Sequence, residues 1–216
     1  MSNAIRIHSF PLSGHAHRVE LFAGLAGIAH EVIRVDLAAG EHKQPAFLEI
    51  NPLGTVPVLQ LDDGTYLSEC TAITEYLDHL DGNPVLTGKT AKERGVIHMM
   101  QKRAESELSD PVGFYFHHAT PGLGAALQPY KSPDWEGRVE WGNRQRDKAL
   151  AGMQYFDQVL RTQPYIAGEQ FSMADITVFA GLIFAGFASI QIPENCTALA
   201  AWQAKVQERP SVKNPA

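Results

Sequence analysis

Cysteine is scarce in this chain of 216 residues, which contains only Cys70 and Cys196. The two lie far apart, and neither belongs to a C-x-x-C pair or to a spacing typical of a metal site. This scarcity argues against a small fold held together by disulfides. Free thiols in a reducing compartment are the expectation, and no metal is expected.

Positive charge is also in short supply, with a net charge of −6 and no run of basic residues. Nucleic acid and anionic membranes are therefore disfavoured as main partners. The uncharged run Ile176–Ile190 is shorter than the roughly 20 residues that span a bilayer, and a soluble-helix cap precedes it, so we interpret it as a buried core helix. Alternating strand residues begin at Ile5, which argues against a signal peptide, and we expect a cytoplasmic protein.

Several catalytic signatures are missing, among them G-x-S-x-G, H-E-x-x-H and G-x-G-x-x-G. Gly88-Lys89-Thr90 is similar to the end of a phosphate loop, but Gly82 lies one residue too far upstream and the segment follows a helix. His117 and His118 are adjacent, so on a helix they diverge and cannot chelate one metal ion together.

What the chain does contain, in its first 81 residues, is the pattern of an α/β domain. An alternating strand, an amphipathic helix and a second strand come first, which implies a parallel pair joined by a crossover helix. A short helix, two strands joined by a turn and an amphipathic helix follow. The resulting β-α-β-α-β-β-α order predicts a thioredoxin-like domain. Its predicted elements are strands at 5–8, 31–37, 58–61 and 65–67, and helices after Gly14, at 45–50 and from Ser68.

Strand signals disappear after the turn-rich segment 81–84. Long helical segments are predicted at 91–118, 135–161, 173–187 and 198–208. We therefore predict a domain at 1–81, a linker at 82–90 and an all-helical domain at 91–216. Ser172 and Asp175 form a capping-box pattern, which we interpret as a folding signal without a catalytic role.

The most informative stretch is Asn51–Leu59, followed by Leu67–Ile73. Pro57 has no N–H and stands ahead of an apolar strand, so the N–H and C=O of Val56 are expected to face outward. Farther on, we predict a helix with Ser68 at its cap and Glu69 in its first turn. A helix start offers unpaired N–H donors and a partial positive charge, which suit a carboxylate. The combination predicts a site for a small peptide.

The Gly-x-Val-Pro-x-Leu segment at 54–59 and the Ser-Glu-x-x-Ala-Ile segment at 68–73 together resemble the glutathione-binding domain of the glutathione S-transferase family. Upstream, Gly-Glu-His-Lys-Gln-Pro at 40–45 and the later Asn51-Pro52 resemble the phi, theta and related serine-type classes. The resemblance implies a thioredoxin-like N-terminal domain, an all-α C-terminal domain that carries an electrophile pocket, a homodimer, and glutathione as co-substrate.

In the serine-type classes a serine after the first strand, followed shortly by Arg-Val, donates a hydrogen bond to the glutathione sulfur. Ser13 stands five residues before Arg18-Val19 and matches that pattern. The resemblance therefore implies that Ser13 stabilises the thiolate, which is the form that attacks. The alternative role for Ser13 is a helix cap alone. His15 is a rival donor to the thiol, or else an exposed residue of the first helical turn.

The resemblance also assigns the rest of the glutathione site. Glu69 would accept from the γ-glutamyl ammonium, and the Cys70 N–H would bind its carboxylate, although the family usually has Ser or Thr at that position. The Val56–Pro57 backbone would pair with the cysteinyl residue by strand addition. The glycyl carboxylate would meet the side chains of His42 and Lys43. A contact from Thr55 is doubtful because its side chain is short. Cys70 could also be a small buried hydrophobe, and Lys43 a solvated loop lysine.

For the electrophile pocket we predict Leu12, Phe114, Tyr115 and His118, with aromatic core packing as the alternative for the last three. The expected function is transfer of the glutathione thiolate to apolar electrophiles, as in detoxification. Two other functions stay open. One is a binding or assembly protein that kept the fold and lost catalysis, and the other is a glutathione-dependent disulfide reductase or dehalogenase.

Overall fold

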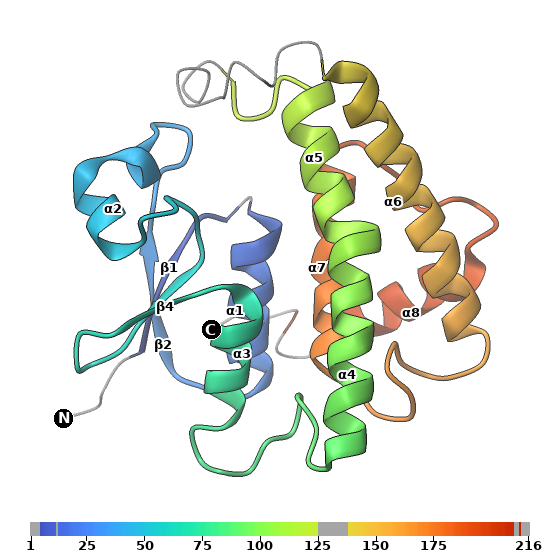
Figure 1. Cartoon of the computed structure of the whole chain (residues 1–216). Coiled ribbons are helices and arrows are strands. Elements are labelled where there is room, and N and C mark those ends of the chain that lie inside the picture. Colours follow the sequence, from blue (N-terminus) through green and yellow to red (C-terminus); the bar gives the residue numbers. More distant parts are fainter. Residues whose placement is uncertain (1–4, 12, 125–137, 210–211, 213–216) are drawn as a thin grey trace.

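The computed structural model describes residues 5–11, 13–124, 138–209 and 212. Its N-terminal part contains a four-stranded sheet in the order β2-β1-β3-β4 (Figure 1). The strands are β1 (Ile5–Ser9), β2 (His30–Arg34), β3 (Val58–Gln60) and β4 (Tyr66–Ser68). β1 pairs in parallel with β2, as the crossover pattern predicted, and antiparallel with β3, which in turn is antiparallel to β4. β2 ends earlier than predicted because its partner β1 ends at Ser9, which is opposite Arg34.

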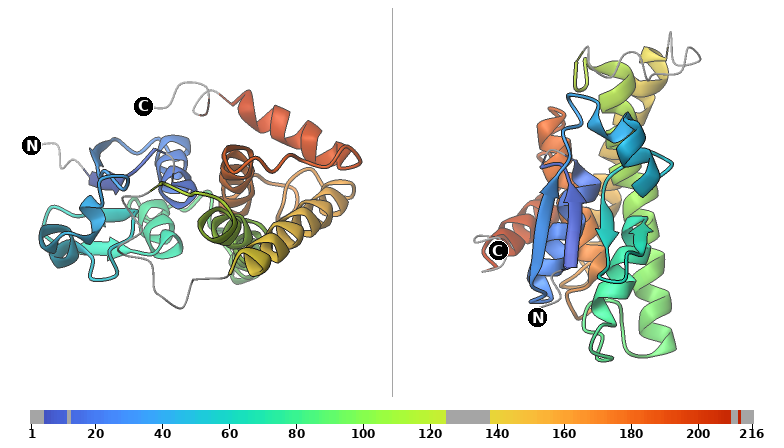
Figure 2. Two further views of the ribbon diagram at one scale, coloured as in Figure 1. Left: turned by 90° about the horizontal axis from the view of Figure 1, so that it is seen from above. Right: turned by 90° about the vertical axis from the view of Figure 1, so that its left-hand side faces the viewer.

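Three α-helices and one 3-10 turn complete this part. They are α1 (Gly14–Leu25), η1 (Glu41–Lys43), α2 (Pro45–Ile50) and α3 (Cys70–Asp78). α1 and α3 lie between the sheet and the helical part of the molecule (Figure 2). α2 packs through Phe47 into a separate small cluster with Val35, Val56 and Val58. The predicted cap of α3 was wrong: Ser68 closes β4, where it pairs with Val58, and Glu69 is the N-cap residue.

In the C-terminal part, the regular elements among the described residues are all helices, joined by turns and loops, apart from one isolated bridge between Tyr165 and Gly168. The predicted helix at 91–118 is one continuous helical run that contains a π-helical turn. α7 is buried almost all round at its N-terminal half, as the uncharged run predicted, and the Ser172–Asp175 capping box is present at its start. The elements are α4 (Ala91–Ala104), η2 (Glu105–Ser109), α5 (Asp110–Ala119), α6 (Val139–Leu160), α7 (Met173–Phe187) and α8 (Thr197–Gln207).

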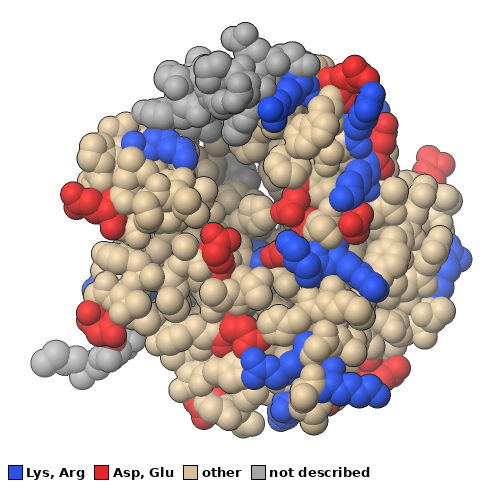
Figure 3. Space-filling model, viewed as in Figure 1, with Lys and Arg blue, Asp and Glu red and all other residues tan. Residues whose placement is uncertain are grey.

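The two parts share one hydrophobic core and meet along an interface, which we call the seam. One hydrophobic cluster runs from Ile7 of β1 through Phe22 of α1 to Phe179 of α7. Within the described residues, no helix combines the length and the apolar character that crossing a membrane requires. The surface is hollowed where the upper ends of the two parts face each other (Figure 3). The candidate site lies at this end of the seam.

Candidate functional site

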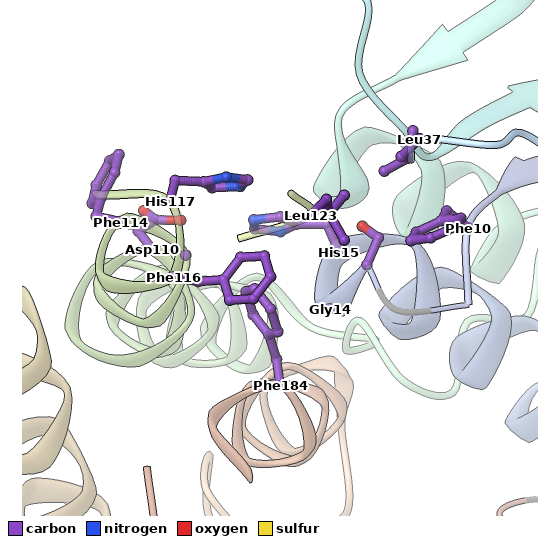
Figure 4. A pocket seen from close by; sticks show the side chains of 12 residues that line it. Phe10, Gly14, His15, Leu37, Asp110, Phe114, Phe116, His117, Leu123 and Phe184 are labelled. Atoms are coloured by element: carbon purple, nitrogen blue, oxygen red, sulfur yellow. The ribbon is translucent and has the colours of Figure 1, made fainter. Parts of the chain in front are cut away.

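A cavity of about 210 Å³ lies between the β1–α1 junction and the helices α5 and α7. Its walls are mainly aromatic and aliphatic, with four polar side chains among them (Figure 4). The N-terminal part contributes Phe10, Ser13, Gly14, His15 and Leu37, and the helical part contributes Asp110, Gly113, Phe114, Phe116, His117, Leu123 and Phe184.

Ser13 caps a helix and also has a hydroxyl group that can donate a hydrogen bond. It is the N-cap of α1, and its hydroxyl oxygen accepts from the N–H of Ala16 at 3.3 Å. A hydroxyl that accepts through oxygen still has its own O–H to donate. Because Ser13 also lines the cavity, that O–H is available to a group bound there. Capping and thiolate stabilisation are therefore compatible.

His15 lines the same cavity, one residue beyond the start of α1. Burial lowers the pKa of its imidazole from the ordinary value, and the nearby Arg18 guanidinium lowers that pKa further, although Glu105 and Glu69 oppose these effects. A neutral ring has one donor and one acceptor nitrogen. His15 therefore has the chemistry to accept a proton from a thiol, but it is less suited to hold a thiolate as a cation.

An extended segment with unpaired backbone contains Val56, which belongs to the small cluster that Phe10 and Leu37 of the cavity wall pack against. The Val56–Pro57 bond is cis, and Val56 is buried. Among the described residues, neither the N–H nor the C=O of Val56 has a hydrogen-bond partner. Buried backbone groups are nearly always paired, so two unpaired groups on one residue indicate a place for a ligand backbone.

The turn before Val56 is held by Asn51, a buried residue that the sequence analysis used only as part of a motif. Its amide nitrogen donates to the carbonyl oxygen of Thr55 at 2.9 Å and to the Thr55 hydroxyl at 3.0 Å. Its amide oxygen accepts from the N–H of Leu53 at 3.2 Å. The Thr55 hydroxyl therefore already has a partner within the turn.

The start of α3 is also open to a ligand. Glu69 is exposed and has a φ of 69° and a ψ of 115°, a conformation that costs a non-glycine residue about 1–3 kcal/mol. No side chain caps the helix, and the N–H groups of Cys70 and Thr71 have no hydrogen-bond partner among the described residues. The Cys70 thiol points elsewhere, because it donates to the carbonyl oxygen of His15 at 3.4 Å. Burial raises the pKa of this thiol, so it stays protonated.

Lys43 contacts the turn that precedes Val56. Its ammonium donates to the carbonyl oxygens of Gly54 at 2.8 Å and Leu53 at 3.2 Å. Burial lowers its pKa, and one of its three N–H donors is left for another partner. The neighbouring His42 is buried, and burial together with Lys43 lowers its pKa. Its Nδ1 atom is enclosed and has no partner in the described part of the chain, which leaves Nε2 as the atom to face a ligand.

Comparison with known proteins identifies the chain. Family models of the glutathione S-transferase N-terminal and C-terminal domains match residues 12–80 and 142–214. Glutathione S-transferase 2 of Saccharomyces cerevisiae is 57% identical over 215 residues, which are 99% of this chain and 90% of that protein. The chain belongs to the glutathione S-transferase family.

Solved structures of glutathione S-transferases confirm the predicted fold class. The crystal structure of Gtt2 from S. cerevisiae superposes with a TM-score of 0.90 at 57% identity and covers 96% of this chain and 98% of that one. A glutathione S-transferase domain-containing protein from Marinobacter aquaeolei VT8 has a TM-score of 0.88 at 44% identity, with 96% and 99% covered. A thioredoxin-like domain followed by a helical domain is therefore the architecture of this transferase.

The helical wall of the transferase cavity differs in part from the set predicted for the electrophile. Phe114 lines the cavity, whereas Tyr115 and His118 are not among its described lining residues. His118 packs instead with Trp141 at a centroid distance of 5.1 Å, and the ring of Tyr115 lies 6.0 Å from the guanidinium carbon of Arg146. Leu12 lies outside the described residues.

A buried ion pair next to the site was missed by the sequence analysis, which used Arg18 only as a marker for Ser13. Arg18 donates to Glu105 at 2.9 Å, and Gln101 donates to the same carboxylate oxygen at 2.7 Å. Gln101 also donates to the Thr71 hydroxyl in the first turn of α3 at 2.9 Å. The pair joins residues 87 positions apart, so no local pattern reveals it. Through Thr71 it connects the helical part to the start of α3.

Proposed function

We propose that this glutathione transferase binds glutathione along Val56 and the start of α3, and that Ser13 stabilises the bound thiolate for attack on an apolar electrophile in the cavity. The observation that carries the proposal is the Ser13 hydroxyl, which lines a largely apolar cavity and whose O–H has no acceptor among the described residues.

The peptide part of the proposal rests on unpaired backbone groups. The Val56 N–H and C=O would pair with the cysteinyl residue of glutathione, as a strand is added to a sheet edge. The free N–H groups of Cys70 and Thr71 would bind the γ-glutamyl carboxylate, which the helix start favours electrostatically. The exposed Glu69 carboxylate would accept from the γ-glutamyl ammonium.

The glycyl end of glutathione would lie near η1. The remaining N–H of Lys43 and the Nε2 atom of His42 would meet the glycyl carboxylate. Thr55 and Pro57 would act through shape and backbone, because the Thr55 hydroxyl is engaged by Asn51 and Pro57 has no N–H.

The electrophile would occupy the cavity with Phe114 on its helical wall. Its volume of about 210 Å³ is below the roughly 300–1,000 Å³ of pockets for drug-sized ligands, which favours a small electrophile. Aromatic substitution, epoxide opening, Michael addition and peroxide reduction are all compatible with a thiolate beside apolar walls. Leu12, Tyr115 and His118 stay predictions for this pocket. From family membership we also propose a cytoplasmic homodimer that acts in detoxification.

The test is a pH titration of the ultraviolet thiolate absorbance of bound glutathione. A hydrogen bond to a charged group contributes about 1.5–3 kcal/mol, so Ser13→Ala should raise the pKa of the bound thiol by roughly 1–2 units. Ser13→Thr keeps the hydroxyl and should leave the thiol pKa close to that of the wild type. Because Ser13 caps α1, thermal unfolding of both variants must be compared as well.

Each outcome has a meaning. A low thiol pKa that Ser13→Ala leaves unchanged, but that His15→Gln raises, would transfer the role to His15. Absence of glutathione binding to the folded wild type would refute the proposal and favour the alternative, an interaction protein on this fold. Binding with reduction of disulfides, but no transfer to any electrophile, would favour the reductase alternative.

A further inference from the structure

One wall of the apolar cavity carries a carboxylate that the proposed transfer reaction does not use. Asp110 is the first residue of α5, and its side chain lines the cavity between Phe114 and His117 (Figure 4). The other described lining residues supply aromatic rings, aliphatic side chains, one hydroxyl and two imidazoles, but no Lys or Arg. Among its described lining residues, the cavity therefore has one acidic group and no permanent cation.

The position of Asp110 follows from the helical repeat. Asp110, Gly113, Phe114 and His117 lie at i, i+3, i+4 and i+7 of α5, so they share one face, and all four line the cavity. Gly113 has no side chain, and a Cβ there would come no closer than 3.8 Å to Phe184. This gap beside Asp110 leaves room for a substrate group next to the carboxylate.

Stabilisation of a helix start does not account for the position of Asp110. A carboxylate in the first turn stabilises a free helix N-terminus. α5 has no free N-terminus, because η2 runs directly into it, and Ser109 and Asp110 both have helical backbone angles. Among the described residues the carboxylate accepts no hydrogen bond and makes no ion pair, so the local structure leaves it without a partner.

The charges around Asp110 come from neighbouring elements. Burial raises the pKa of its carboxyl group, and the Glu105 carboxylate of η2 raises that pKa further. Lys102 of α4, Arg18 of α1 and Lys148 of α6 act in the opposite direction. These cations are engaged elsewhere: Arg18 and Lys102 contact Glu105, and Lys148 lies 3.6 Å from Glu107. None of the three lines the cavity.

We propose that Asp110 determines which electrophiles the cavity accepts: it disfavours those that carry an anionic group and favours those that carry a cationic group. This inference rests on the proposed function. An anion on the substrate would be repelled by the carboxylate, because no described residue of the cavity wall offers it a compensating cation. A cation or a strong hydrogen-bond donor would instead meet an unpartnered acceptor beside Gly113.

The experiment uses three substrates with the same reacting carbon and different charges: 4-chloro-3,5-dinitrobenzoate, its methyl ester, and its 2-(trimethylammonio)ethyl amide. For each, kcat/KM with glutathione is measured for the wild type and for Asp110→Asn. The ratio of variant to wild type cancels the intrinsic reactivity of the substrate. From the Coulomb energy of charges several ångströms apart in partly screened surroundings, the ratio should rise roughly 3- to 30-fold for the anion relative to the ester. For the cation it should fall by a similar factor.

Two further variants serve as controls. Asp147→Asn changes the net charge equally but lies exposed on α6 and outside the cavity lining, so its three ratios should agree. Asp110→Glu keeps the charge and should restore the wild-type order of substrates, which also guards against a folding defect in Asp110→Asn. Titration of the three glutathione conjugates into each protein gives a readout that needs no turnover.

The outcomes separate this inference from the proposed function. Equal ratios for all three substrates with Asp110→Asn would overturn the specificity role while leaving glutathione transfer intact. The same charge-dependent change with Asp147→Asn would overturn it as well, because the effect would then come from net charge. If the wild type conjugated none of the three substrates and bound none of the conjugates, both the proposed function and this inference would be refuted.

Discussion

Replacing Glu105 by Gln tests how far the two parts of the transferase depend on their buried ion pair. The Arg18 side chain is only 3% exposed and the Glu105 side chain 17%, so both charges are largely removed from water. Glu105 also accepts from Gln101, and Lys102 lies 3.3 Å from its other oxygen. The Glu105 carboxylate therefore accepts from Arg18 of the N-terminal part and from Gln101 and Lys102 of the helical part.

The expected loss of stability follows from the cation that stays behind. Removing one partner of a buried pair costs about 3–5 kcal/mol, because the remaining charge is left uncompensated. The Nε atom of Arg18 is already buried without a partner in the described part of the chain, so the guanidinium has little else to satisfy it. Glutamine keeps one amide oxygen as an acceptor, which places the expected loss near the lower bound, at about 3 kcal/mol.

The pH dependence adds a second signature. Burial opposes ionisation of Glu105, but the Arg18 guanidinium and its hydrogen bond outweigh burial, so the pKa of the carboxyl group is lowered. A lowered pKa means that the stabilisation is present above the unfolded-state value of about 4.3 and is lost as the pH falls through the folded-state value. The difference between wild type and Glu105→Gln should be constant from about pH 6 to 8 and shrink below about pH 4.

The assay is urea unfolding, monitored by fluorescence and by circular dichroism so that separate unfolding of the two parts is detected. Glu140→Gln is the matched control, because Glu140 pairs with Arg144 at 2.7 Å but both side chains are more than 70% exposed. That control should lose less than about 0.5 kcal/mol. A loss for Glu105→Gln no larger than that of the control would refute the reasoning from burial.

Three further predictions concern packing, the ligand site and pH. Gly152→Ala in α6 would place a Cβ atom 2.1 Å from a backbone oxygen of η2 and should cost about 1–3 kcal/mol, whereas Gly95→Ala in α4 meets nothing within 4 Å and should gain about 0.5–1 kcal/mol; equal urea midpoints would contradict this. Cys70→Ala should change the Kd for glutathione in calorimetry by less than about threefold, because the proposed contact is the backbone N–H, and a tenfold loss would assign the contact to the thiol. Burial raises the pKa of Asp175 to about 6, so its contribution to stability is full below the unfolded-state value of about 3.9 and is lost as the pH rises through about 6. The unfolding free energy of the wild type should therefore fall relative to that of Asp175→Asn across this interval, and a constant difference would contradict the shift.

Helices whose ends are determined by residues close in sequence were predictable from the sequence. α2 begins at Pro45 and ends at Ile50, as predicted, because proline fits the first helical position. α7 has its predicted bounds because Ser172 and Asp175 form the cap and the following run is apolar. In both cases residues close in sequence determine the boundary.

Boundaries that depend on distant partners were not predictable in the same way. Ser68 has a good capping side chain, but its pairing with Val58 keeps it in the sheet, so the N-cap moves by one residue to Glu69 and the helix begins at Cys70. The positive φ of Glu69 results from the same constraint, since the chain must leave β4 and enter α3 within one residue. Local capping preference was outweighed here by strand pairing.

The electrophile wall shows the same limit more sharply, because it depends on the rotation of one helix. Phe114, Tyr115 and His118 were predicted together near the end of one long helix, with aromatic core packing as the alternative, and of these three Phe114 is among the described residues that line the cavity. Both His117 and His118 lie within one turn of Phe114, so the helical repeat alone cannot choose between them. Trp141 of α6 packs 5.1 Å from both Phe114 and His118, whereas His117 is the histidine that lines the cavity, so the rotation of α5 is set by its packing against neighbouring helices. Once that rotation is fixed, the face that contains His117 must also contain Asp110, which is why the carboxylate in the cavity emerges from packing and not from any motif.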